Sequence, residues 1–213
     1  MITIFRNIKE TSTPFFKDIE FVLERIKNGK YIDLINQIRE EEDKSARNEL
    51  KKNLPAICFS GTFKKRSDDA IVEHSGLICL DFDGYDDVSD MLKEKKKMSS
   101  DKYVMAVFVS PSGNGLKAII KIPKEPNNHK RYFDALKEYF DSPYFDVTSK
   151  NISRVCYESY DPEIHVNLDS ELWDTLSDLN SKPIERSAAL NTIPVTDEKK
   201  IIDRITRSEE RRV

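Results

Sequence analysis

The sequence has few of the residues that build disulfide scaffolds and zinc frameworks. Its 213 residues include three cysteines, six glycines and one tryptophan. Cys58, Cys79 and Cys156 lie far apart in apolar segments, so we expect buried, reduced thiols rather than a disulfide or zinc framework. No apolar run approaches the length of a membrane span, and the first residues lack the pattern of a signal peptide. We therefore expect a cytoplasmic protein without a membrane partner.

A strong net charge is also absent. The chain has 35 Lys and Arg against 38 Asp and Glu, for a formal net charge of −3. Nucleic-acid coat and chromatin proteins are usually strongly basic, so this balance argues against that class. The densest basic runs, at residues 64–66 and 93–97, are interpreted as solvated faces. A chain of this length can form one domain with a substantial core.

An apolar, strand-like run at residues 76–80 ends in Asp81-Phe82-Asp83. Strand side chains repeat with a period of two, so Asp81 and Asp83 should project from the same face. Two adjacent carboxylates repel each other unless a cation, a proton or a basic side chain lies between them. The pair predicts a metal site, and an ordinary solvent-exposed strand end is the alternative with equal weight.

The stretch that follows predicts an α+β fold. Its order is β-α-β-β-α-β, which is typical of an RRM-like or ferredoxin-like split sheet. The strands are expected at residues 77–83, 103–110, 116–122 and 152–158, and the helices at about 86–98 and 128–141. We expect three regions: an N-terminal helical extension packed on the core (1–55), the core itself (56–178), and a linker that leads into a truncated C-terminal region (179–213).

The strand order of such a sheet, 4-1-3-2, brings three polar segments to one edge. The acid pair ends the first strand, the turn at residues 112–117 opens the third, and residues 146–154 lead into the fourth. Glycines in the turn permit close approach to a ligand, although any hairpin could require them. Lys117 lies beside the turn and adds to its signal. Arg154, within an apolar run, needs an anionic partner, either a structural carboxylate or a ligand phosphate.

With these residues assembled, the chain resembles the family named for the VirE N-terminal domain, a primase-polymerase branch of the archaeo-eukaryotic primase superfamily. The resemblance covers most of residues 1–170. It is carried by Leu54-Pro55-Ala56, Phe59-Ser60-Gly61-Thr62-Phe63, His74-Ser75-Gly76-Leu77-Ile78, Asp81-Phe82-Asp83, Ser110-Pro111-Ser112-Gly113-Asn114-Gly115-Leu116-Lys117, Asp146-Val147, Ser153-Arg154-Val155-Cys156-Tyr157 and Ser159-Tyr160-Asp161-Pro162.

The resemblance implies a primase-like nucleotidyltransferase of a mobile-element or phage replication protein, which works by two-metal phosphoryl transfer. It implies that Asp81, Asp83 and Asp146 bind Mg²⁺ or Mn²⁺, and that these acids and Lys117 are catalytic. The incoming nucleotide would lie against Ser110, Ser112, Gly113, Gly115, Lys117 and Arg154. The implied partners are a nucleoside triphosphate, single-stranded or template DNA, and a helicase domain in the same or a neighbouring chain.

Two other functions remain open at this point. Lys117 stands where many superfamily members have a histidine, and its protonation and reach differ. A catalytically inactive nucleic-acid-binding module of a replication protein is therefore the first alternative. The second is a haloacid-dehalogenase-like phosphatase, because Asp81-Phe82-Asp83-Gly84 matches its nucleophile motif. Against that reading, Tyr85 replaces the usual Thr or Val, and that fold has a parallel, doubly wound sheet.

Overall fold

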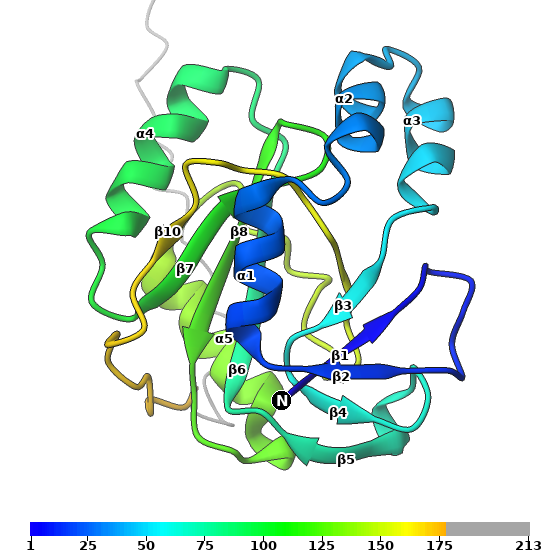
Figure 1. Ribbon diagram of the computed structural model, residues 1–213. Coiled ribbons are helices and arrows are strands. Elements are labelled where there is room, and N and C mark those ends of the chain that lie inside the picture. Colours follow the sequence, from blue (N-terminus) through cyan, green and yellow to red (C-terminus); the bar gives the residue numbers. More distant parts are fainter. Residues whose placement is uncertain (178–213) are drawn as a thin grey trace, which may run out of the picture. The chain divides into compact units, whose positions relative to one another are not determined.

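The structure is a computed structural model that describes residues 1–177 as a succession of short strands and helices. The first elements are β1 (Ile2–Phe5), β2 (Phe15–Lys17), α1 (Ile19–Asn28), α2 (Ile32–Glu40) and α3 (Lys44–Lys51). Next come β3 (Ala56–Cys58), β4 (Gly61–Phe63), β5 (Ile71–His74), β6 (Leu77–Asp83) and α4 (Val88–Ser99). The last are β7 (Val104–Val109), β8 (Gly115–Lys121), α5 (His129–Phe140), β9 (Cys156–Tyr157) and β10 (His165–Val166) (Figure 1). The expected linker at residues 179–213 lies outside the described residues.

The long strands form an antiparallel sheet in the order β10-β7-β8-β6. The predicted succession of strand, helix, strand, strand and helix is present as β6, α4, β7, β8 and α5. Strands β7 and β8 pair as a hairpin, and β8 pairs with β6 along its whole length. All described strand pairs are antiparallel, which disagrees with the parallel sheet that the phosphatase alternative requires. Among residues 1–177, no helix is long and apolar enough to span a membrane.

The predicted fourth strand of this sheet, at residues 152–158, is wrong. Only Cys156–Tyr157 is a strand there, and it pairs with β3 in a second sheet of order β2-β1-β3-β9. The place beside β6 is taken by residues 144–146, where Phe82 and Phe145 form an antiparallel bridge. The apolar pattern predicted too long a strand, since residues 152 and 153 lie in a turn. It also could not show which sheet the segment joins, because pairing depends on contacts distant in sequence.

The N-terminal segment is more than a helical extension. Strand β1 lies in the middle of the second sheet, between β2 and β3, so these first residues complete the sheet to which β3 and β9 belong. The expected single strand at residues 56–63 is divided in two. Its first half, β3, pairs with β1, and its second half, β4, pairs with β5 in a separate small sheet.

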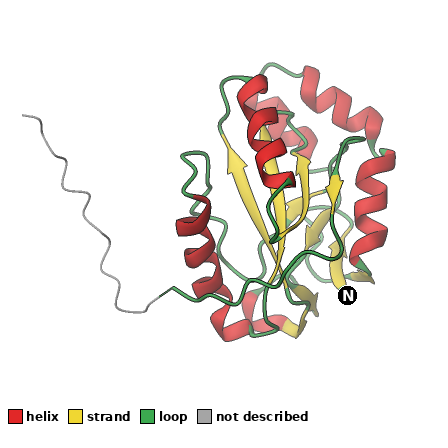
Figure 2. Ribbon diagram, turned by 90° about the vertical axis from the view of Figure 1, so that its left-hand side faces the viewer, coloured by secondary structure: helices red, strands yellow, loops and turns green. Residues whose placement is uncertain are grey.

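Two hydrophobic cores lie on opposite faces of the long-stranded sheet. On one face, alternate residues of β6 such as Leu80 and Phe82 pack with side chains of α4 and α5. On the other face, Leu77 and Cys79 pack with side chains of α1 and β1. Helices therefore cover both faces of the sheet (Figure 2). By the same alternation, the acid pair of β6 belongs to the face toward α1 and β1, at the end of that core.

Two buried histidines connect the small sheet to α5. The His74 Nδ1 accepts a hydrogen bond from the Gly76 amide, so the neutral ring carries its proton on Nε2 and donates it to His129 Nδ1, 3.1 Å away. Burial is the main cause that lowers the pKa of His74 to about 4 and that of His129 to about 3, and Lys124 lowers the pKa of His74 further. Both rings are therefore neutral in the folded protein at neutral pH.

This pair predicts a pH-dependent stability. In the unfolded chain each histidine protonates near pH 6.5, whereas in the folded protein it stays neutral until pH 3–4. The contribution of the neutral rings to the free energy of unfolding is fully present above the histidine pKa of the unfolded chain. It decreases as the pH falls below that pKa, by about 2 kcal/mol per ring between pH 7 and pH 5. Urea unfolding at both pH values measures the difference. In the double variant His74→Gln/His129→Gln, the difference in the free energy of unfolding between pH 7 and pH 5 should be less than half of that in the unchanged protein. An identical pH dependence in the variant and the unchanged protein would contradict the prediction.

Candidate active site

The floor of the main cleft is formed by the end of β6 and the start of β8. The strand register places Asp81 opposite Lys117 and Asp83 opposite Gly115. Asp81 is only 5% exposed, whereas Asp83 is exposed at the strand end. A Cβ at Gly115 would lie 2.4 Å from Asp83 Oδ1, closer than real Cβ contacts allow. Glycine at position 115 therefore lets the Asp83 carboxylate lie against the backbone of β8.

The third acid, Asp146, reaches the site through the segment that lies beside β6. The Asp146 amide donates to the Asp81 carbonyl at 2.8 Å, and the Asp83 amide donates to the Tyr144 carbonyl at 2.8 Å. The Thr148 amide and hydroxyl donate to Asp146 Oδ1 at 2.9 and 2.7 Å, which orients this carboxylate. As a result, one carboxylate oxygen from each of Asp81, Asp83 and Asp146 lies within 4.8 Å of the others.

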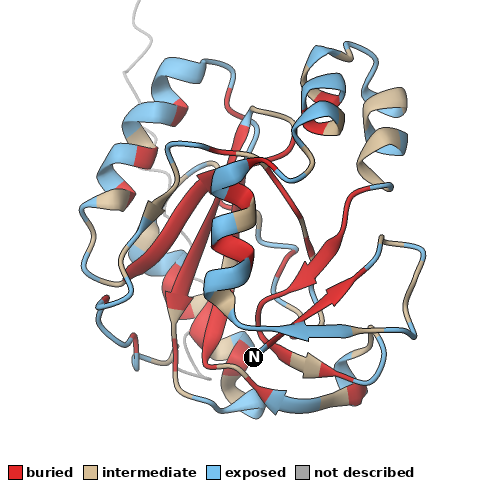
Figure 3. Ribbon diagram, in the orientation of Figure 1, coloured by how far each residue is buried: buried red, intermediate tan, exposed pale blue. Residues whose placement is uncertain are grey.

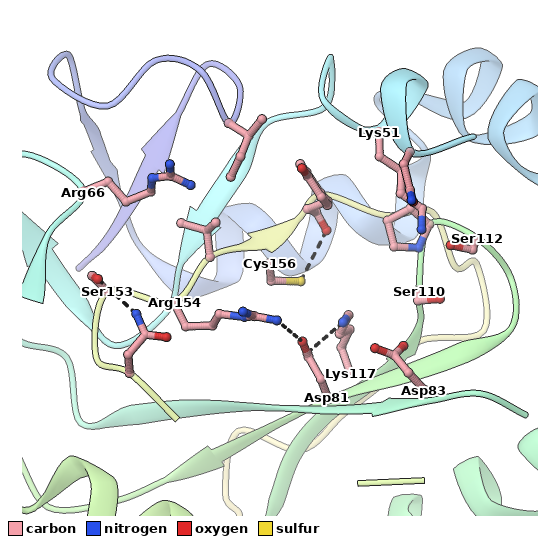
Figure 4. A pocket seen from close by; sticks show the side chains of 16 residues that line it. Lys51, Arg66, Asp81, Asp83, Ser110, Ser112, Lys117, Ser153, Arg154 and Cys156 are labelled. Atoms are coloured by element: carbon pink, nitrogen blue, oxygen red, sulfur yellow. Dashed lines mark hydrogen bonds and ion pairs between the residues drawn. The ribbon is translucent and has the colours of Figure 1, made fainter. Parts of the chain in front are cut away.

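Two cations approach the buried acid. The Lys117 Nζ lies 2.7 Å from Asp81 Oδ1, and the Arg154 guanidinium lies 3.9 Å from Asp81 Oδ2 (Figure 4). The same guanidinium lies 3.4 Å from Asp146 Oδ2. Burial raises the pKa of Asp81 above its usual value, although Lys117 opposes this shift. Burial alone would lower the pKa of Lys117, but negative groups led by Asp81 outweigh it and raise that pKa. Lys117 is thus a permanent cation.

The glycine turn before β8 forms one end of the cleft. The Ser110 amide donates to the Gly115 carbonyl at 2.8 Å, and Gly113 has a φ of +80°, which favours glycine. Ser110 is buried and lines the cleft, and its hydroxyl has no hydrogen-bond partner among the described residues. Ser112 also lines the cleft. A buried hydroxyl without a protein partner can serve a bound ligand.

The cleft has a second basic wall that the sequence analysis missed. Lys51 of α3 and Arg66 line it, together with Asn48. In Figure 4 Lys51 and Arg66 lie across the cleft from Asp81 and Asp83. The basic run at residues 64–66 was interpreted as a solvated face, yet its last member faces the cleft. The cleft volume is about 550 Å³, which is large enough for a small-molecule ligand.

The acids fit a divalent cation by their donor type and spacing. Three carboxylates supply only oxygen ligands, which Mg²⁺ and Mn²⁺ prefer. Among residues 1–177, no other group of three His, Cys, Asp or Glu side chains is close enough to hold a metal ion. All predicted site residues except Gly113, Gly115 and Asp146 line the cleft directly. Gly113 and Gly115 lie in the turn and the strand that form its end and floor, and Asp146 lies next to Asp81.

The contact between Lys117 and Asp81 predicts a large effect on stability. Lys117→Met leaves a buried carboxylate without its nearest cation, and we expect a loss of about 3–5 kcal/mol in the free energy of unfolding. Arg154→Met is the matched control, because that side chain is 42% exposed and should cost about 1 kcal/mol or less. If the acids bind metal, Mn²⁺ should raise the melting temperature of Lys117→Met more than that of the unchanged protein. Equal stabilities of the two variants would contradict this account.

Comparisons with known proteins identify the family. The model of the BT4734-like, N-terminal domain family matches residues 49–165. No curated protein matches the chain. Among solved structures, the archaeo-eukaryotic primase domain of the cyanophage S-2L primase-polymerase is similar over 62% of this chain and 72% of that chain, with 15% identity and a TM-score of 0.41. Similarity at that level says nothing about activity. Because the family model matches more than half of the 213 residues, the chain belongs to the family of BT4734-like N-terminal domains.

Proposed function

We propose that this domain is a metal-dependent nucleotidyltransferase of the primase-polymerase type, which joins nucleotides on a nucleic-acid template. One observation carries the proposal: Asp81 and Asp83 line a cleft that also has cationic side chains, and the carboxylate of Asp146, from a distant chain segment, lies within 4.8 Å of theirs. Acids that gather within 4.8 Å suit divalent cations, and the cations around them suit the phosphates of a nucleotide.

In this proposal Asp81, Asp83 and Asp146 hold Mg²⁺ or Mn²⁺. Bound divalent ions supply an activated attacking hydroxyl and neutralise charge on the phosphates and the leaving group. The chain itself orients the acids. Gly115 leaves room for the Asp83 carboxylate, and Thr148 fixes that of Asp146.

The remaining side chains bind and orient the nucleotide. Lys117 and Arg154 lie beside the acids, where they can contact phosphate oxygens. Lys51 and Arg66 provide positive charge on the opposite wall. The free hydroxyl of Ser110 can donate one further hydrogen bond. We propose that these groups replace water around the triphosphate, because a fixed polar environment holds charge without reorganising.

The partners follow from the same proposal. A nucleoside triphosphate would occupy the cleft, and single-stranded or template DNA would lie next to it. A helicase domain in the same or a neighbouring chain would supply strand separation, as in a mobile-element or phage replication protein of the cytoplasm. These assignments rest on the resemblance and on the chemistry of the cleft.

One observation favours a second candidate, a nucleic-acid-binding module without catalysis. Lys117 already neutralises Asp81 at 2.7 Å, and a permanent cation there competes with a metal ion for the same oxygens. In that case the cleft would bind anions through its basic side chains, and the acids would serve to hold Lys117 and Arg154 in place.

The acids provide the direct test. Titrations with Mn²⁺, with and without a nucleoside triphosphate, should show that Asp81→Asn, Asp83→Asn and Asp146→Asn each weaken metal binding at least about tenfold, since each removes a charged ligand. Gly115→Ala should act like Asp83→Asn, because its Cβ displaces that carboxylate. Asp174→Asn, at an exposed position outside the cleft, is the control.

A primer-extension assay with labelled nucleotides and single-stranded DNA then separates the two candidates. The nucleotidyltransferase should extend a strand only with divalent metal and with all three acids. DNA binding without metal dependence and without synthesis would favour the binding module instead. Metal binding that is unchanged in the three Asn variants would refute the proposed metal site.

A further inference from the structure

A second cavity, outside the cleft, lies between the second sheet and α1. Its volume is about 270 Å³. We call it the aromatic groove, and its defining residues are Arg6, Phe15, Lys17, Phe21, Arg25 and Tyr31. All six precede residue 49, where the match to the family model begins. Three aromatic and three basic side chains thus line one hollow in the N-terminal segment.

Two of the three aromatic rings of the groove are exposed to solvent, and Tyr31 is partly buried. Phe15 is 49% exposed and Phe21 is 40% exposed. Strand β2 is exposed along its length at the edge of the second sheet (Figure 3). Its register pairs Phe15 with Ile4 and Lys17 with Ile2, so Phe15 and Lys17 lie on one face and Phe16 lies on the other. Exposed large rings clustered in a hollow indicate a binding surface rather than scattered surface residues.

Cations surround these rings. The Lys17 Nζ lies 5.1 Å and the Arg25 guanidinium 5.4 Å from the centre of the Phe21 ring. Arg25 is fixed by two hydrogen bonds to Glu158, of 2.9 and 2.8 Å, and also lies 5.5 Å from the Tyr31 ring. Arg6 and Lys17 form no ion pair with any acid of residues 1–177, and none of the groove-lining residues is acidic.

The groove and the cleft are neighbours along the chain in two places. Arg6 lines the groove and Ile8, two residues later, lines the cleft. Pro55 also lines the groove, and the next residue, Ala56, pairs with Tyr157, which lines the cleft. The two hollows are therefore lined by residues that are adjacent or nearly adjacent along the chain.

We propose that the aromatic groove binds single-stranded nucleic acid and holds the template where it leaves the cleft. Stacking of bases on exposed rings, with cations for the backbone phosphates, is the chemistry by which proteins bind single strands without sequence preference. The role as template holder rests on the proposed function, whereas binding itself requires neither the acids nor a metal ion.

Fluorescence anisotropy with a labelled oligothymidylate of about 16 nucleotides, in EDTA, tests the groove. The double variant Phe15→Ala/Phe21→Ala should weaken binding at least about tenfold, because each ring stacks on a base. Phe16→Ala is the matched control: the residue is adjacent and 41% exposed, but it points to the other face, so binding should stay within about twofold. Phe21→Trp should retain binding, and Lys17→Gln should reduce the dependence of log affinity on log salt by about one.

The outcomes separate this inference from the proposed function. If Phe15→Ala/Phe21→Ala binds the oligonucleotide as tightly as the unchanged protein, the groove is not the binding surface, whatever happens in the cleft. If sedimentation shows that the double variant changes self-association and not DNA binding, β2 is an interface between two copies and the inference is overturned. Asp81→Asn should lose metal but retain oligonucleotide binding in EDTA. A loss of metal binding in Asp81→Asn tests the proposed metal site of the cleft and does not bear on the aromatic groove.

Discussion

The register between β6 and β8 is the constraint on which the cleft depends. It places Asp81 opposite Lys117 and Asp83 opposite Gly115, where a side chain would displace the carboxylate. Apolar residues of β6 that face α4 and α5 hold this register. A slip by one residue would turn both acids into that hydrophobic core, away from Lys117. The stability of the fold and the proposed chemistry therefore depend on the same pairing of β6 with β8.

Much of the cleft could be predicted from the sequence, because its main parts lie in adjacent strands. Alternation along the strand at residues 77–83, a local pattern with a fixed period, placed Asp81 and Asp83 on one face. The strand order typical of the predicted fold placed the strand that contains Lys117 beside them, and the structure shows that pairing together with the expected strand, helix, strand, strand and helix. The roles assigned to these residues stay predictions.

The other parts depend on pairings that no local pattern reveals. Asp146 lies beside Asp81 because three residues around Phe145 bridge to β6, not because residues 152–158 form a strand there. Cys156–Tyr157 joins β3 instead, in a sheet whose middle is β1. Lys51 and Arg66 reach the cleft through this arrangement of the N-terminal segment, and in the sequence they resemble ordinary surface charge. The aromatic groove was missed for the same reason.

The central claim is that three carboxylates, two of which line the cleft while the third lies beside them, form one metal site. A crystal structure of the protein grown with Mn²⁺ and a non-hydrolysable nucleoside triphosphate, with the anomalous signal of manganese recorded, tests it most directly. We predict an anomalous peak at roughly 2.0–2.3 Å from carboxylate oxygens of Asp81, Asp83 and Asp146, with Lys117 moved toward the phosphates. A cleft that holds the nucleotide with no peak at these acids, and with Lys117 still 2.7 Å from Asp81, would contradict the account.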